Sequence, residues 1–343
     1  MYLIPKEKDP PKKSRLISSY SAHPLRTVYK RTSAILTWCF SEISDYKHFT
    51  LYKLSDIKKR TKAACRWFRR LGPSTDLLTI QTDVKQMYTN LKHNEILTAI
   101  NWLLDKVLSN LNKRKRNLKF LLIDKTNKKI IRPSTGTDNE NWISFTKQDI
   151  INVVTLDLST AYQTANSSIF RQTTGCPMGG YLSAIYANVK CAYDESLFIH
   201  NLGPTHNRIY GIRQMDDLLL WIAYNRTSYR SRIEAEKLKQ TILTNNKLYK
   251  GGLELEEQER LEGRDGRPYN KFAGTQIRTA TQPGITIVVA PHNRNSDTLK
   301  TSGLQQYPRF PHFNSFTPLH YKTGTLRSTF IRLESQSSDT QPY

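Results

Sequence analysis

The sequence is short of carboxylates and cysteines and has no long apolar run, and each shortage narrows the class of protein. Asp and Glu together number 29 against 52 Lys and Arg, which gives a formal net charge of +23. No run of eighteen apolar residues occurs, so no transmembrane helix is expected. The four cysteines lie far apart, with no C-x-x-C pair and no secretory leader, which predicts free thiols in a reducing compartment. The histidines show no metal-ligand spacing with a cysteine, so no structural zinc is expected.

The length and the net charge of the chain indicate how many subdomains it forms and which class of partner it binds. At 343 residues it exceeds what one hydrophobic core usually serves, so two or three packed subdomains are expected. The excess of positive charge in a folded protein indicates a polyanionic partner, and nucleic acid comes first. The alternative is a basic surface that serves solubility alone.

Apolar periodicity predicts strands and helices along the chain. The clearest helix begins near residue 93, and its apolar residues recur at three- and four-residue steps on a face expected to be core, namely Ile96, Ile100, Leu103, Leu104, Val107 and Leu111. A strand is expected at "DLLTIQTD", and a basic loop or hairpin tied to a helix before it. Residues 120 to 142 predict a hairpin or an insertion, and residues 146 to 164 a helix. A helix is also expected at "TSYRSRIEAEKLKQTILTNNKLY", a short strand at "KFAGTQI", and disorder in the last ten residues.

Two adjacent carboxylates, Asp216 and Asp217, stand between the strand-like runs "IYGIRQ" and "LLLWIAY". If these runs pair as antiparallel strands, both acids fall at the tight connection between them. Like charges repel and resist burial, so a cation, a basic partner or open water has to stabilise them. Asp83, at the end of "LLTIQTDV", is placed to be a third acid at a neighbouring strand end, and such an oxygen cage suits Mg²⁺.

Three carboxylates that hold two divalent ions stabilise both the attacking and the leaving oxygens of nucleotidyl transfer. The N-terminal loop would supply positive charge to a triphosphate through Lys6, Lys8, Lys12, Lys13 and Arg15. The alternative interpretation is that an Asp pair is an ordinary turn and that the basic residues are generic RNA-binding charges. The order along the chain favours catalysis, because a basic loop, a strand ending in Asp, a helix, a Gly-rich turn entering a helix and a hairpin with two Asp follow one another.

In this order, five stretches resemble the fingers and palm of reverse transcriptases, and in detail the Penelope-like and telomerase-related branch. They cover roughly residues 4 to 280: "IPKEKDPPKKSRLISSY" resembles the first fingers motifs, "TDVKQMYTNL" motif A, "RQTTGCPMGGYLSAIYANV" motif B, "RQMDDLLLWIA" motif C and "YNKFAGTQI" the strand near the primer grip. The resemblance implies an α/β (α+β) right-hand polymerase, with fingers over residues 1–75, a palm over 76–280, and a small thumb-like extension with a disordered tail over 281–343.

The resemblance also implies roles for single residues. Asp83, Asp216 and Asp217 would be the catalytic acids that bind two Mg²⁺ ions, or Mn²⁺ in their place, and the backbone carbonyl of Val84 would be an extra ligand. Tyr88 falls at the steric gate, where an aromatic ring lies against the sugar C2′ and leaves no room for a hydroxyl. RNA-dependent RNA polymerases have Asp at that position and Gly-Asp-Asp in motif C. The other residues implied to bind substrate or template are Lys6, Arg15, Gln172, Gly175, Met178, Gly179 and Gly180.

Two features depart from the family pattern. Gln214 stands where members usually have Tyr, which puts the packing beneath the acids or the rate in doubt. Asp157 is followed by Tyr162 five residues on and so also resembles motif A. Only fifteen residues separate Asp157 from Gln172, too few to finish a strand, turn and run a helix back before motif B. Asp157 is therefore expected to be a polar position on the helix before motif B.

These observations predict an RNA-directed DNA polymerase that extends a primer on an RNA template with dNTPs, with no membrane association. The alternatives are a polymerase that makes RNA or needs no template, and a maturase-like RNA-binding protein that retains the palm without using it.

Lys247 or Lys250 would be a motif D lysine. Nothing after residue 280 resembles the GIY-YIG endonuclease of many Penelope-like elements, and the large N-terminal region of telomerases is missing, so a compact polymerase, a fragment or a relic is expected. The location would be the mitochondrion if the chain is organelle-encoded, and otherwise the nucleus.

Overall fold

The chain forms two units, each assembled from segments that are distant in sequence. One unit comprises residues 1–48, 85–203 and 245–254, and the other residues 49–84, 204–244 and 255–343. The computed structural model describes residues 2–5, 14–18, 20–43, 47–53, 56–114, 117–128, 130–137, 140–165, 168–244, 248–257, 272–278 and 285–291. Lys6, Lys247 and the last ten residues, on which predictions were made, lie outside this description. The predicted boundaries near residues 75 and 280 stay a prediction.

A four-stranded sheet organises the second unit, in the order β11 (Glu254–Glu257), β3 (Thr75–Lys85), β10 (Asp217–Asn225) and β9 (Ile209–Gln214). Strand β10 lies antiparallel to both of its neighbours, β3 and β9. Its first seven residues are all buried, so both faces of this strand are covered. The predicted strand ending near Asp83 and the predicted hairpin around the acid pair are therefore confirmed as neighbouring strands of one sheet.

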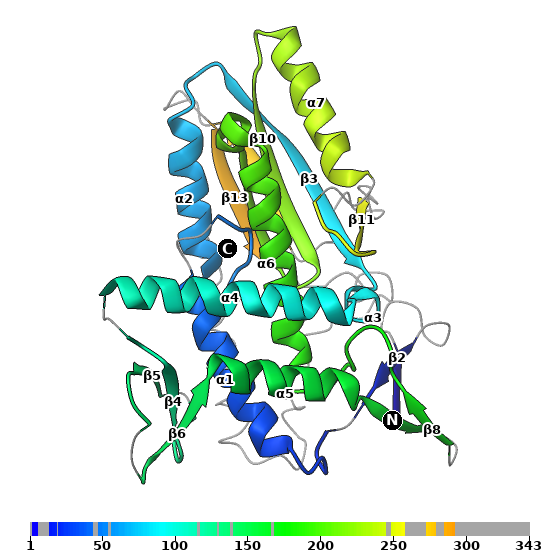
Figure 1. The fold of residues 1–343 in the computed structure, drawn as a ribbon. Helices are drawn as coiled ribbons and strands as arrows, with labels where there is room; N and C mark the ends of the chain where they lie inside the picture. The colour runs from blue at the N-terminus through cyan, green and yellow to red at the C-terminus, as the bar shows by residue number, and fades with distance from the viewer. Residues whose placement is uncertain are drawn as a thin grey trace, which may run out of the picture. The chain divides into compact units, whose positions relative to one another are not determined.

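Helix α2 (Ile57–Arg69) covers one face of this sheet. Its apolar residues pack in a cluster with alternate residues of β10, which include Leu219, Trp221 and Ala223. Helix α7 (Tyr229–Leu243) packs along β10, and Figure 1 shows the sheet lying between α2 and α7. The short η2 (Gly203–Arg208) leads into β9.

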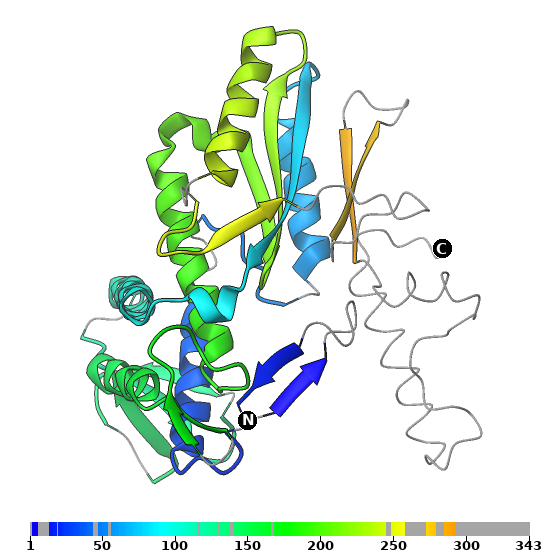
Figure 2. The same cartoon turned by 90° about the vertical axis from the view of Figure 1, so that its right-hand side faces the viewer.

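A separate two-stranded sheet in the second unit joins β12 (Phe272–Arg278) to β13 (Ile285–Pro291), and β13 contacts α2. Figure 2 shows this pair beside α2. Strand β12 confirms the strand predicted at "KFAGTQI". Strand β13 was not predicted, because its apolar run "ITIVV" lies at the start of a segment rich in Pro, Asn, Ser and Thr.

Four helices form the core of the first unit: α1 (Arg26–Glu42), α4 (His93–Arg114), α5 (Lys147–Ser159) and α6 (Ser183–Asn201), with the short α3 (Met87–Asn90) beside α6. The apolar stripe predicted on α4 is buried over Ile96, Ile100, Leu103, Leu104 and Val107, whereas Leu111 is half-buried. Helix α6 is buried around most of its circumference. Among the described residues, no helix is long and apolar enough to cross a membrane.

Short strands surround these helices: β1 (Tyr2–Pro5) pairs with β2 (Ser14–Ile17), and β7 (Tyr162–Ala165) with β8 (Ser168–Arg171). Residues 120 to 146 form a sheet in the order β5 (Ile131–Ser134), β4 (Phe120–Asp124) and β6 (Trp142–Thr146), which adds a third strand to the predicted hairpin.

The helix predicted over residues 146 to 164 is wrong at its C-terminal end. A capping box between Thr146 and Asp149 begins α5 as expected. The helix stops at Ser159, where the hydroxyls of Ser159 and Thr160 join the N–H of Thr160 in donating to the carbonyl of Leu156, and such local side-chain bonds compete with continuation of the helix. The β-forming residues that follow then pair with β8 instead of extending the helix.

Candidate active site

Two of the three predicted catalytic acids face each other across adjacent strands. Asp83 on β3 is the cross-strand partner of Asp217 on β10, and Gln214 on β9 is the partner of Asp217 on its other side. Directly opposed residues project to the same face of a sheet, so these three polar side chains form one row. Asp217 is fully buried, and Asp83 is half-buried. We call Gln214, Asp217 and Asp83 the acid row.

The third acid lies in the turn that joins β9 to β10. Met215 and Asp216 form this turn, and Met215 has φ of 57°, in the left-handed region that a non-glycine residue seldom adopts. The backbone N–H of Val84 donates to the carbonyl of Asp216 at 2.8 Å, which ties the end of β3 to the turn. The turn therefore holds Asp216 next to the acid row in a conformation that costs about 1 kcal/mol or more.

Arg213 places a buried positive charge at the same end of the sheet. Its side chain is fully buried, and its Nη1 donates to the carbonyl of Met215 at 2.8 Å. Its Nη2 donates to the hydroxyl of Thr50. Two carboxylates about 5 Å apart, the usual spacing of cross-strand partners, repel by roughly 3 kcal/mol at an effective dielectric near 20. Arg213 precedes Gln214 on β9 and so lies on the other face of the sheet from the acid row, where its guanidinium fixes the turn backbone. Periodicity did not identify Arg213, because one charged residue at a strand end is ordinary.

The donor chemistry of the acid row suits a divalent cation. Oε1 of Gln214 is buried and has no hydrogen-bond partner within the described ranges. Carboxylate and amide oxygens are the ligands that Mg²⁺ and Ca²⁺ take. Among the residues that the structure describes, no three Asp, Glu, His or Cys side chains are already arranged to ligate one ion. The residues therefore fit a cation in type and strand register, and their side chains would have to rotate to hold it.

The predicted motif B turn, residues 172–180, lies in the first unit, where it contacts the backbone at Tyr88. Gly175 has φ of 77°, and a Cβ added there would lie 2.7 Å from the carbonyl oxygens of Tyr88 and Thr89. The N–H of Cys176 donates to the carbonyl of Tyr88 at 2.6 Å, and the N–H of Gly175 to that of Leu91 at 2.7 Å. Only glycine leaves room for this close backbone contact. Gly175 is therefore needed here for more than the formation of an ordinary turn.

The far end of the same turn contacts the N-terminal hairpin. The N–H of Ser18, just after β2, donates to the carbonyl of Met178 at 2.7 Å. A Cβ added at Gly179, whose φ is 105°, would clash with the carbonyl oxygen of Ser18. Arg15 is a residue of β2 and is the cross-strand partner of Ile4. The structure thus brings the end of β2, the turn and the Tyr88 backbone together in one unit, whereas the acids belong to the other.

Asp157 is not at a strand end, and its predicted place on the helix before motif B is confirmed. It is buried on α5, and the hydroxyl of Tyr186 donates to its Oδ2 at 3.0 Å. Burial raises the pKa of Asp157 from 3.8 to about 6, although the Tyr186 hydrogen bond opposes that shift. Burial likewise raises the pKa of Tyr20, with the charge of Asp157 adding to the effect.

Lys190 on α6 is a buried cation that the sequence analysis missed. Its Nζ donates to Asp194, lies 3.3 Å from Oε2 of Glu95, and donates to the carbonyl of Lys250 at 3.3 Å. The N–H of Lys250 donates to Oδ2 of Asp194 at 2.9 Å. This network anchors the backbone of Lys250, a residue considered for motif D, onto α6. A Lys and an Asp four residues apart on a largely apolar helix are the signal that would have revealed it.

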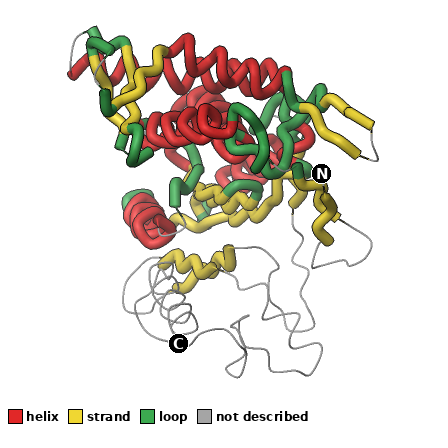
Figure 3. The backbone as a smooth tube through the Cα atoms, turned by 90° about the horizontal axis from the view of Figure 1, so that it is seen from below, coloured by secondary structure: helices red, strands yellow, loops and turns green. Residues whose placement is uncertain are grey.

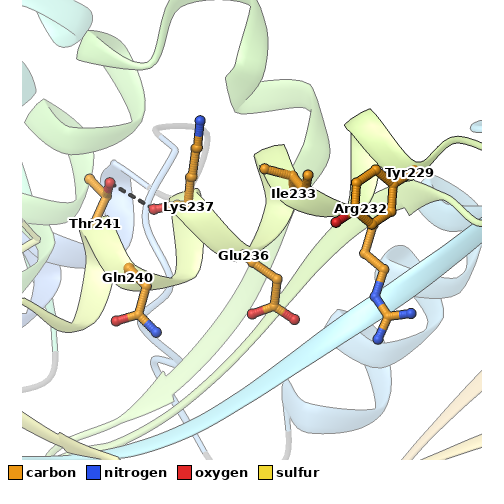
Figure 4. A pocket seen from close by; sticks show the side chains of 7 residues that line it. All are labelled: Tyr229, Arg232, Ile233, Glu236, Lys237, Gln240 and Thr241. Atoms are coloured by element: carbon orange, nitrogen blue, oxygen red, sulfur yellow. Dashed lines mark hydrogen bonds between the residues drawn. The ribbon is translucent and has the colours of Figure 1, made fainter.

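A groove of about 630 Å³ runs along α7 and contains none of the predicted site residues. Its lining side chains, shown in Figure 4, all come from this one helix: Tyr229, Arg232, Ile233, Glu236, Lys237, Gln240 and Thr241. A stripe along one helix does not surround a ligand in the way that small-molecule sites do. The acid row therefore remains the candidate site.

Comparison with known proteins identifies the fold. No protein-family model and no curated protein matches the sequence. The structure is similar to telomerase from Candida albicans in complex with a fragment of telomeric RNA, at 14% identity and a TM-score of 0.51, over 66% of this chain and 34% of that one. It is also similar to telomerase from Candida tropicalis with such a fragment, at 16% identity and a TM-score of 0.51, over 93% of this chain and 44% of that one.

These structural neighbours are catalytic subunits of telomerase, a reverse transcriptase family. The chain therefore has a mixed α/β fold of the kind found in telomerase, which agrees with the predicted fold class. It spans less than half the length of these neighbours. The layout of fingers, palm and thumb stays a prediction.

We predict that Asp157→Asn stabilises the protein at neutral pH. A carboxyl whose pKa is raised on folding contributes stability that is complete below pH 3.8 and is lost as pH rises through about 6. Asn at this position has no charge to bury, so the variant should exceed the parent by up to about 3 kcal/mol at pH 7.5 and match it near pH 4. Urea unfolding at both pH values measures the difference.

Asp149, on the same helix, serves as a control for which the opposite change in stability is expected. Hydrogen bonds from Thr146 lower the pKa of Asp149, so Asp149→Asn should destabilise the protein at pH 7.5, with the loss shrinking at acidic pH. If both variants changed stability in the same direction at pH 7.5, the account of Asp157 would be wrong.

Proposed function

We propose that the protein is a nucleic-acid polymerase of the reverse-transcriptase type, which extends a primer with dNTPs on an RNA template. The observation that carries this proposal is the acid row, in which Asp83 and Asp217 are cross-strand partners and Asp216 follows in the adjoining turn. Three carboxylates at one end of an antiparallel sheet are the ligand set that nucleotidyl transfer with two metal ions needs. The fold shared with telomerase is consistent with it.

In this reaction the primer 3′ oxygen forms a bond to the α-phosphorus of the nucleotide, the α–β phosphoanhydride bond breaks, and pyrophosphate leaves. Bound Mg²⁺ ions would lower the charge on the attacking and leaving oxygens. Asp83, Asp216 and Asp217 would hold these ions, with the carbonyl of Val84 as an additional ligand. The buried Arg213 would keep the turn that carries Asp216 in place, because its guanidinium donates to the turn backbone.

The turn and hairpin of the first unit would bind the nucleotide and template. Gly175 and Gly179 allow close backbone packing, which positions the turn against Tyr88 and the end of β2. Tyr88 would exclude a ribose 2′-hydroxyl, so dNTPs would be preferred over NTPs. Arg15 on β2 and Lys6 after β1 would contribute positive charge to the triphosphate.

The positive charge of helix α2 favours the prediction that the protein binds a polyanionic partner. It carries six cationic residues and no acidic one within its bounds, and the cations most exposed to solvent are Lys59, Lys62, Arg66 and Arg69. The opposite side of the helix packs on the sheet, so the cations are arranged on the solvent side. Such a stripe matches the backbone of a nucleic acid, which carries one phosphate per nucleotide. The telomerase neighbours were themselves solved with RNA, which favours RNA as the nucleic acid.

Primer extension tests the proposal directly. A labelled oligo(dT) primer on poly(rA) with dTTP and Mg²⁺ should be extended by the parent protein, and the rate should fall roughly 10³-fold in Asp83→Asn and Asp216→Asn, as expected when metal ligands worth several kcal/mol are lost. Asp105→Asn is the matched control, because Asp105 is an exposed carboxylate on α4 that pairs with Lys147. It should extend the primer at the parental rate.

Further reactions separate the alternatives. Faster incorporation of NTPs than of dNTPs would indicate an RNA polymerase. Extension of the primer without a template would indicate a terminal transferase. RNA binding without Mg²⁺-dependent extension would indicate a maturase-like binding protein. Parental rates in both Asp83→Asn and Asp216→Asn would contradict the proposal.

The salt dependence of RNA affinity tests the role of α2. Replacing Lys62, Arg66 and Arg69 with Gln should lower the affinity for a single-stranded RNA and flatten the plot of log K against log salt concentration by about 2, at roughly 0.7 for each lost phosphate contact.

The control replaces an equal number of exposed cations on α7, namely Arg230, Arg232 and Lys237. If the two triple variants flattened the salt plot equally, net charge alone would explain binding, and α2 would have no particular role.

A further inference from the structure

The β7–β8 hairpin exposes large apolar side chains on a protein surface. Tyr162 is 59% exposed, Ile169 71% and Phe170 56%, and all four residues of β8 are exposed. Figures 1 and 3 both show this hairpin projecting from the helices of its own unit. These side chains are therefore accessible to a ligand, and a tyrosine offers it both an aromatic face and a polar hydroxyl.

The strand register assigns these side chains to faces. Tyr162 and Arg171 are direct cross-strand partners, so they lie on the same face, and Ile169 lies on that face two residues before Arg171. Phe170 lies on the opposite face, because successive residues of a strand alternate. One face of the hairpin therefore presents an aromatic ring beside a guanidinium.

The base of this hairpin is fixed to the motif B turn. The N–H of Gln172 donates to the carbonyl of Ala161 at 2.9 Å and closes the hairpin. Nε2 of Gln172 donates to the carbonyl of Thr174 at 3.0 Å, and the chain passes directly into Gly175. The exposed face is thus held next to the turn that we propose binds the template.

Charge and size indicate the kind of partner. No Asp or Glu occurs in the sequence between Asp157 and Asp194, and Arg171 is exposed, so no carboxylate of this segment opposes a phosphate at that guanidinium. A face of two four-residue strands covers on the order of 100 Å², from about 3.3 Å per residue and 4.8 Å between strands. That is far below the roughly 800 Å² per partner of a stable protein interface, but it is about the size of one nucleotide.

We propose that this face binds an unpaired nucleotide of the single-stranded template, with its base stacked on Tyr162 and the adjoining phosphate held by Arg171. Every base has an aromatic face, so such a contact tolerates any template sequence. The inference rests on the proposed function, since it assigns the hairpin to the template of that polymerase. It adds a binding site for the segment of template that has not yet been copied.

Equilibrium binding tests this site without requiring catalysis. The probes are an RNA template annealed to a DNA primer with a 5′ single-stranded RNA overhang, and the same duplex without the overhang. A 2-aminopurine base in the overhang reports stacking through quenching of its fluorescence. The parent should bind the overhang probe more tightly than the flush probe and should quench the 2-aminopurine.

Tyr162→Ala should weaken binding of the overhang probe roughly 5- to 150-fold, the range for loss of one stacked base, and abolish quenching. Tyr162→Phe keeps the ring and should retain both. Arg171→Gln should weaken binding and flatten its salt dependence. Phe170→Ala on the opposite face and Tyr229→Ala, which removes a tyrosine 80% exposed on α7, should bind like the parent. Because these side chains are exposed, the variants should fold normally, which circular dichroism verifies.

Equal binding of the overhang probe by Tyr162→Ala and the parent would overturn the proposal, as would equal losses in Tyr162→Ala and Phe170→Ala. A shift in the monomer–dimer equilibrium of Tyr162→Ala with unchanged RNA affinity would also overturn it, because the hairpin would then contact a second copy of the chain. Primer extension by the parent distinguishes these failures from failure of the proposed function, since extension does not depend on which side chain stacks the overhang.

Discussion

The pairing of Asp83 with Asp217 across adjacent strands is the constraint on which the candidate site depends. Like charges placed directly opposite each other destabilise a sheet, so the rest of the sheet must impose this register. Strand β10 does so, because it is buried on both faces and pairs with β3 over nine residues. A slip of one residue would move every side chain of β10 to the other face of the sheet. The apolar core thereby maintains two carboxylates in an arrangement that they would not adopt alone.

Backbone contacts have the corresponding role in the first unit. Gly175 and Gly179 have positive φ, and each lies against a carbonyl oxygen at a distance that no Cβ tolerates. The motif B turn is therefore joined to Tyr88 at one end and to Ser18 at the other by main-chain hydrogen bonds. Such contacts fix the turn relative to both segments, which is the positioning that the proposed nucleotidyl transfer would require. The β7–β8 hairpin extends from the same turn, and all four residues of β8 are exposed.

Local patterns predicted the elements that carry the acids, but not the interactions between distant residues. Alternating apolar residues indicated the strands around Asp83 and Asp217, and chain length correctly placed Asp157 on a helix. The motif order placed Asp83 at a strand end near the acid pair, whereas the register that makes it the direct partner of Asp217 depends on the fold. Arg213 and Lys190 were missed because their burial depends on partners from other elements. The end of α5 was misplaced, because the hydroxyls of Ser159 and Thr160 cap it locally and β8 competes for the next residues.

Thermal unfolding with and without Mg²⁺ tests the central claim, that the sheet opposes two carboxylates which a divalent cation stabilises. In EDTA the parent should gain about 1 to 2 °C in Tm on addition of excess Mg²⁺ at constant ionic strength, as binding worth about 1 kcal/mol implies for a chain of this length. Asp83→Asn should have a higher Tm than the parent in EDTA, because one charge of the pair is gone, and should not respond to Mg²⁺. An equal response to Mg²⁺ in the two proteins would contradict the account.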